Sequence, residues 1–265
     1  MTTRRWGVLG CVRCKDAGSL DSSAIEATED AAACVHSAFR QSVLVLLEVL
    51  TVAKGSPTVN RVSVGTSGWS YPSWRPGFYP AGLDPSGFLA FYAERFSTVE
   101  LNTTGYRLPA EEQFRRWAEQ VPDGFEFAPK LPGERPGIVA EFDGRVRHLG
   151  DRLGPVRISL KSKRDEGILE LLIGSLDPSR RLAFDLEHPS WDGIEPRLAE
   201  AGAVRVDDLD HPAPFRYLRR REAPDDAFAA VVAAAQEPVY VYFRHDDEPA
   251  APAHAERLRE LLGAR

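Results

Sequence analysis

Three side chains able to transfer protons stand at the ends of short apolar runs in this chain. Glu100 lies near the end of one run, Lys130 ends the next, and His188 directly follows a later one. A carboxylate and an ammonium group in one dry pocket shift each other's pKa, which is how enzymes make general acids and bases. We therefore predict that Glu100 and Lys130 share acid–base work, assisted by His188 or Asp246.

The same residues also admit purely structural interpretations. Glu100 and Lys130 would equally form a buried ion pair that only stabilises the fold, and a lone histidine is usually an ordinary loop residue. The aspartates and histidines within 207–211 and 245–247 are too scattered to specify a metal site. No metal site is predicted, and the cofactor stays unknown.

Aromatic, amide and cationic side chains near these runs suit the binding of a small polar, anionic ligand. Arginine binds phosphate or carboxylate through two parallel hydrogen bonds, and indole rings can wall a ligand pocket. The predicted ligand-binding residues are Trp69, Asn102, Tyr106, Trp191, Arg219 and Arg244. A hydrophobic lid explains the tryptophans equally well, and a solvated face explains the outer arginines.

Eight β-rich runs would position these residues: 61–66, 96–102, 125–130, 155–160, 182–187, 203–207, 215–219 and 239–243. Helical patterns separate most of them, at 88–96, 109–120, 165–176, 195–201, 225–235 and 252–262, whereas 208–214 leaves no room for a helix. This alternation predicts an α/β protein, a small TIM-type (β/α)8 barrel with some helices reduced. An open doubly wound sheet is the alternative.

In such a barrel the active site lies at the carboxyl ends of the strands, and side chains alternate between the interior and the helix layer. This alternation directs an unusually charged set of side chains inward: Glu100, Asn102, Glu126, Lys130, Arg157, Ser159, Asp185, Glu187, Arg205, Asp207, Tyr217, Arg219, Tyr240, Tyr242 and Arg244. Unpaired buried charges cost several kcal/mol. The interior should therefore hold a paired network or the polar floor of a ligand site.

The composition changes near residue 60. Residues 1–60 hold one of the 20 prolines and all three cysteines, so we expect an N-terminal extension, partly helical, ahead of a barrel domain at 61–265. An apolar run at 43–53 is too short to cross a membrane. Three cysteines indicate a reducing, cytoplasmic location, and the net charge of -6 makes nucleic acid an unlikely partner.

Several longer motifs in the sequence resemble those of one known family. The motifs are GTSGWSY at 65–71 with Trp74, TVELNTT at 98–104 with Tyr106, FEFA at 125–128 with Lys130, HPSW at 188–191, and VYVYF at 239–243. In this order they resemble the YecE-like domain-of-unknown-function family 72. The resemblance implies a TIM-type barrel whose biochemical activity is unassigned.

We thus expect an enzyme of unknown reaction that acts on a small polar or anionic ligand at the C-terminal face of the barrel. Glu187 and Arg244 depart from what that family usually carries, which favours a second possibility, a non-catalytic barrel that binds a ligand or a protein. A third possibility is a nucleic-acid-processing barrel, supported by the cluster of arginines at 216–221 and opposed by the overall acidity.

Overall fold

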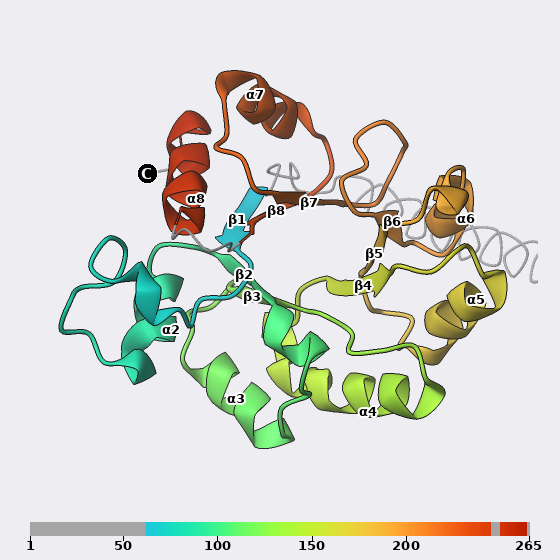
Figure 1. Cartoon of the computed structure of the whole chain (residues 1–265), viewed down its shortest axis with the longest axis horizontal. Helices are drawn as coiled ribbons and strands as arrows, with labels where there is room; N and C mark the ends of the chain where they lie inside the picture. Colours follow the sequence, from blue (N-terminus) through green and yellow to red (C-terminus); the bar gives the residue numbers. More distant parts are fainter. Residues whose placement is uncertain (1–61, 245–249, 264–265) are drawn as a thin grey trace, which may run out of the picture. The chain divides into compact units, whose positions relative to one another are not determined.

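The computed structural model describes residues 62–244 and 250–263, in which eight strands alternate with helices (Figure 1). The strands are β1 (Val62–Thr66), β2 (Thr98–Leu101), β3 (Glu126–Pro129), β4 (Val156–Leu160), β5 (Leu182–Leu186), β6 (Val204–Arg205), β7 (Arg216–Arg220) and β8 (Val239–Phe243). The helices are α2 (Phe88–Ala93), α3 (Glu111–Glu119), α4 (Pro136–Val146), α5 (Glu166–Ser175), α6 (Glu195–Glu200), α7 (Asp226–Ala234) and α8 (Ala251–Leu261). The predicted extension at 1–60 and Asp246 lie outside the described residues.

The strands form a closed parallel ring. Hydrogen-bonded ladders join β7, β8 and β1, then β2 and β3, then β4, β5 and β6. Single parallel bridges close two of the remaining gaps, Ser67 with Glu100 and Lys130 with Arg157. The Asp207 backbone N–H closes the last gap with a 3.0 Å hydrogen bond to the Tyr217 carbonyl oxygen. The predicted α/β barrel is confirmed, with the helices outside the ring (Figure 1).

Two apolar clusters show how side chains alternate across the strands. Along β8, Val239, Val241 and Phe243 belong to the large cluster beneath the helices, whereas Tyr240 and Tyr242 belong to a smaller cluster inside the ring. Fully buried tyrosine hydroxyls need hydrogen-bond partners. Tyr242 and Thr98 share one at 2.8 Å, and Tyr240 donates to Glu126 at 2.9 Å.

The predicted helices are present, and several begin at an aspartate cap. Asp165 accepts a hydrogen bond from the Ile168 N–H at 3.1 Å, and Asp225 accepts one from the Phe228 N–H at 2.8 Å, as N-cap residues do. No helix occupies the segment between β6 and β7, as expected. The helix α4 was not predicted, and its proline at the first turn provides its start.

Two of the inward orientations were wrong. Val204 and Val206 occupy the interior at β6, so Arg205 points outward, 2.5 Å from Glu195 of α6. The strand is only two residues long, and burying two valines is more favourable than burying one arginine. Glu187 lies beyond the end of β5, on the surface, 3.4 Å from Lys161.

Candidate functional site

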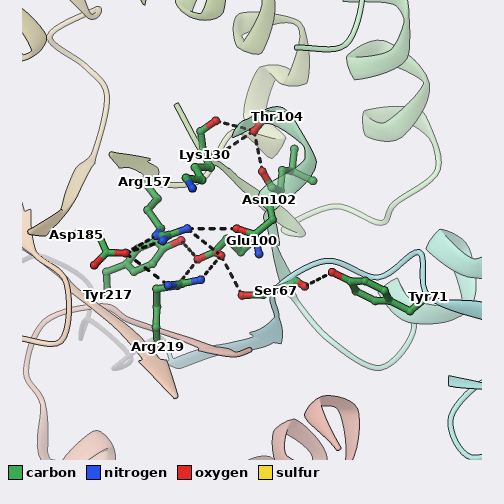
Figure 2. A network of polar contacts seen from close by, with 11 residues as sticks. Ser67, Tyr71, Glu100, Asn102, Thr104, Lys130, Arg157, Asp185, Tyr217 and Arg219 are labelled. Atoms are coloured by element: carbon green, nitrogen blue, oxygen red, sulfur yellow. Dashed lines mark hydrogen bonds and ion pairs between the residues drawn. The ribbon is translucent and has the colours of Figure 1, made fainter. Parts of the chain in front are cut away.

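The carboxylate of Glu100 forms the centre of a polar network inside the barrel, toward the carboxyl ends of the strands (Figure 2). Its side chain is fully buried. Arg219 from β7 binds it through two hydrogen bonds, Nε to Oε2 at 2.9 Å and Nη2 to Oε1 at 3.0 Å. The Tyr217 hydroxyl and the Ser67 hydroxyl each donate at 2.9 Å. Side chains from β7 and from the end of β1 thus converge on one carboxylate of β2.

Arg157 of β4 links this carboxylate to a second one. It donates from Nε to Asp185 Oδ2 at 3.0 Å and lies 3.4 Å from Glu100. Its Nη1 also donates to Asn102 Oδ1 at 3.2 Å. Arg219 Nη1 lies 3.5 Å from the same Asp185 oxygen. Two guanidinium groups and two carboxylates therefore form one neutral cluster.

The network fixes Glu100 in its ionised form. Burial alone would raise its pKa, but the charges of Arg219 and Arg157, together with the hydrogen bonds from Arg219 and Ser67, lower the pKa to about 2. A general acid or base works best when its pKa is close to the operating pH. The geometry therefore favours a structural and electrostatic role for Glu100 over proton transfer.

Lys130 lies at the edge of this cluster, just after β3. The Thr104 hydroxyl accepts a hydrogen bond from the Lys130 backbone N–H at 3.0 Å, which pins the residue (Figure 2). Its Nζ lies 5.8 Å from the centre of the exposed Tyr106 ring. Within residues 62–244 and 250–263, no carboxylate lies within ion-pair distance of that amine. The predicted ion pair between Glu100 and Lys130 is absent, because the arginines occupy the carboxylate.

The environment of Lys130 makes its charged ammonium form less stable than it is in water. Burial lowers its pKa, and the positive charge of Arg157 lowers it further, against the smaller opposing effect of Glu100. The charges of Arg157, Arg219, Glu100 and Asp185 cancel, so the ammonium form of Lys130 adds one positive charge beside this cluster. A half-buried amine with a lowered pKa is a typical proton-transfer group or nucleophile.

The remaining predicted residues lie in different places. Trp69 is buried edge-on to Trp117, with ring centres 5.3 Å apart. Trp191 does not wall the mouth of the barrel as predicted. It is fully buried, and its Nε1 donates to the Ser162 carbonyl oxygen at 3.0 Å, because an indole fills the core once its N–H has a partner.

The contacts of His188 lie within its own turn, outside the Glu100 network. His188 Nδ1 accepts a hydrogen bond from the Ser190 N–H at 3.0 Å and so caps a short turn. Arg244 follows β8, and its backbone N–H donates to the Arg220 carbonyl oxygen at 2.7 Å. Their predicted roles have no support from these contacts.

Two hollows adjoin the network. A cleft of about 960 Å³ runs from Trp69 and Asn102 to Trp117 of α3. A smaller pocket of about 330 Å³ lies between the ends of β3 and β4, and we call it the lysine pocket. Its walls are Gly105, Lys130, Leu131, Pro132, Gly133, Glu134, Ile158, Ser159, Lys161 and Ser162.

Sequence reasoning missed Glu134 as a site residue and did not select Arg157 or Asp185. Alternation along the strands points Arg157 and Asp185 inward, so that signal was available. Glu134 follows Lys130 by four residues in the loop after β3, the position where barrels place functional groups. In the described part of the chain, no three His, Cys, Asp or Glu side chains gather as a metal site would require.

These observations define the class of protein. A closed ring of eight parallel strands, with polar side chains gathered toward their carboxyl ends, is a TIM-type barrel. Residues 63–265 match the family described as "Protein of unknown function DUF72". The chain belongs to this family.

Individual relatives agree with this assignment. The chain is 30% identical over 142 residues to the UPF0759 protein YecE of Escherichia coli strain K12, and the match covers 49% of this chain and 50% of that protein. YecE of Escherichia coli O157:H7 matches equally. The chain thus spans about half the length of the curated relatives it matches. The crystal structure of a DUF72 family protein from Enterococcus faecalis V583 superposes with a TM-score of 0.61 at 16% identity, covering 77% of this chain and 98% of that one.

None of the described helices is both long and apolar enough to cross a membrane.

Proposed function

We propose that this barrel is an enzyme that acts on a small anionic molecule at the carboxyl ends of its strands, with Lys130 as the group that transfers the proton. The observation that carries this proposal is the lysine amine, which lacks a carboxylate partner among the described residues while both neighbouring carboxylates bind arginine. A surplus cation in a partly desolvated pocket attracts anions and holds them more strongly than in water.

The arginines and carboxylates beneath Lys130 supply a rigid floor. Arg157 is the central group of this floor, because it binds Glu100, Asp185 and Asn102 and also lowers the pKa of Lys130. A preorganised charge of this kind costs no reorganisation during a reaction. Glu100 acts in this proposal as the residue that positions Arg157 and Arg219.

Proton transfer at neutral pH favours the amine over the carboxylate. The pKa of Lys130 is lowered, chiefly by burial, whereas that of Glu100 lies at about 2, far below the physiological range. A lysine with a lowered pKa can accept a proton as the neutral amine and return it as the ammonium ion. The cysteine content supports a reducing cytoplasm as the place where this occurs.

The non-catalytic alternative is a barrel that binds the same class of ligand without turnover. It would need only the surplus charge and not a lowered pKa. The nucleic-acid alternative has less support from two of its arginines, since Arg219 binds Glu100 in the interior and Arg216 pairs with Glu237.

A metabolite screen by thermal shift on the full chain tests the proposal, followed by turnover assays of each stabilising compound. We expect anionic metabolites to raise the melting temperature of the wild type, and Lys130→Met to abolish that rise. The matched control is Lys163→Met, which removes an exposed lysine outside the lysine pocket.

The assays separate the possibilities. If the Lys130 amine is the proton-transfer group, Lys130→Met should lose both binding and turnover. Lys130→Arg should regain part of the binding but not the rate. Binding without turnover of any stabilising compound would favour the non-catalytic barrel. Anion stabilisation that survives in Lys130→Met would overturn the proposal.

A further inference from the structure

The lysine pocket contains polar groups that the network around Glu100 does not use. It lies between the loop after β3 and the loop after β4, and Lys130 is the residue it shares with the proposed site. Its volume of about 330 Å³ is at the small end of the range for ligand sites. The space suits a small metabolite and not a macromolecule.

Ser159 provides an unsatisfied hydroxyl in the wall of this pocket. Its Oγ is shielded from solvent and has no hydrogen-bond partner in the part of the chain that the structure describes. A buried hydroxyl without a partner costs about 1–3 kcal/mol, so buried hydroxyls in folded proteins normally have one. A rotation of the Ser159 side chain toward the pocket would let a ligand oxygen supply that partner.

The two lysines of the pocket differ in whether a carboxylate already pairs with them. Lys161 lies 3.4 Å from Glu187 with both side chains well exposed, so its attraction for an anion is weak and screened by solvent. Lys130 has no competing carboxylate among the described residues, and Gly105 allows its stem to lie close against the backbone of the loop. A Cβ built on Gly105 would stand 2.7 Å from Lys130 Cδ.

One acidic side chain also lines the pocket. Glu134 is half-buried there and has no partner among the residues that the structure describes. Its negative charge opposes an anion and would favour a cation. The sign of its effect on binding therefore reports the charge of whatever the pocket holds.

We propose that the lysine pocket seats the oxyanion group of the ligand, a phosphate or a carboxylate, between the Lys130 amine and the Ser159 hydroxyl. The inference rests on the proposed function, because it places the charged end of the same anionic ligand. The rest of the molecule would extend toward Asn102 and Arg157, on the network side of Lys130 (Figure 2).

The test is an NMR titration of the full chain with inorganic phosphate and, separately, with acetate. We expect saturable shifts of amide signals from 130–134 and 159–162 with at least one of the two ions. The stronger ion identifies the natural group as phosphoryl or carboxylate. Arginine and lysine hold phosphate by charge-assisted hydrogen bonds, so Lys130→Met should weaken binding about tenfold or more.

Three further variants make the result specific. Ser159→Ala should weaken binding about three- to tenfold, as the loss of a neutral hydrogen bond does. Glu134→Gln should strengthen it about two- to fivefold, because it removes a partly solvated negative charge. Partial unfolding cannot produce this opposite sign. Lys163→Met should leave binding unchanged.

Several outcomes would overturn the inference. These are an absence of saturable shifts with either ion, shifts that map outside the lysine pocket, equal losses in Lys130→Met and Lys163→Met, or weaker binding in Glu134→Gln. If a metabolite from the thermal screen still required Lys130 after one of these results, the proposed function would stand and only this placement would fail. If neither metabolite nor ion required Lys130, both would fail.

Discussion

Glu100→Gln tests whether the buried network holds the barrel together. The substitution keeps the size of the side chain and removes its charge, which leaves Arg219 with only 9% of its side chain exposed and no full counter-charge at its Nε and Nη2. Breaking a buried ion pair by removing one partner typically costs about 3–5 kcal/mol. We expect a loss of this size in the free energy of unfolding.

The pKa of Glu100 leads independently to a similar figure. It falls from 4.5 to about 2 on folding, and at 1.36 kcal/mol for each pKa unit this contributes about 3 kcal/mol. Because the folded chain binds fewer protons here, the stabilisation is present above about pH 4.5 and is lost as the pH falls toward 2. The variant should lack this part of the acid dependence.

Urea unfolding followed by far-UV circular dichroism at pH 7, and again at intervals down to pH 3, measures both effects. The matched control is Glu170→Gln, which removes a two-point contact with Arg197 on the surface, with distances of 2.8 and 2.6 Å. An exposed pair of this kind is worth at most about 1 kcal/mol. Adding Arg219→Met to Glu100→Gln should recover part of the loss, since the unpaired charge is then gone.

The reasoning would be refuted if Glu100→Gln and Glu170→Gln cost the same. It would also be refuted if adding Arg219→Met lowered the stability of Glu100→Gln by as much as it lowers the stability of the wild type. Either result would mean that water or a rearrangement compensates the guanidinium group.

Three other substitutions have predicted effects. Gly105→Ala should displace the Lys130 stem at a cost of about 0.5–1.5 kcal/mol, seen as two- to tenfold weaker phosphate binding in the NMR titration with little change in melting temperature. Asp165→Ala removes the cap of α5 and should cost about 1 kcal/mol in urea unfolding; Asp165→Asn should restore most of it. Lys130→Met should leave the melting temperature equal or higher at pH 7, because folding disfavours the charged amine; a large drop would contradict this.

The strands could be read from the sequence because their composition and their geometry agree. In β8 the alternation of Val239, Val241 and Phe243 with two tyrosines predicts both the strand and its two faces. The same reasoning failed for Arg205, because a strand of two residues is too short to show an alternation of apolar and polar side chains. It also missed α4, which contains two glycines that weaken a helical pattern.

The candidate site was predictable only in part, because alternation assigns a side chain to a face but not to a partner. It placed Glu100 and Arg219 inside the ring, where they do meet. It could not decide which of three cations binds the carboxylate. Guanidinium forms two parallel hydrogen bonds to a carboxylate and is more weakly hydrated than an ammonium group, so arginine is favoured in a dry interior.

That competition connects the stability of the barrel to its proposed chemistry. If Lys130 paired with Glu100, as the sequence alone suggests, its ammonium form would be favoured and the pocket would carry no surplus charge. Since Arg157 and Arg219 take the carboxylates instead, they leave the lysine amine free of them and also lower its pKa by repulsion. The same two arginines therefore stabilise the interior and set the properties of Lys130. Substitution of Arg157 would alter both at once, whereas substitution of Lys130 separates function from folding.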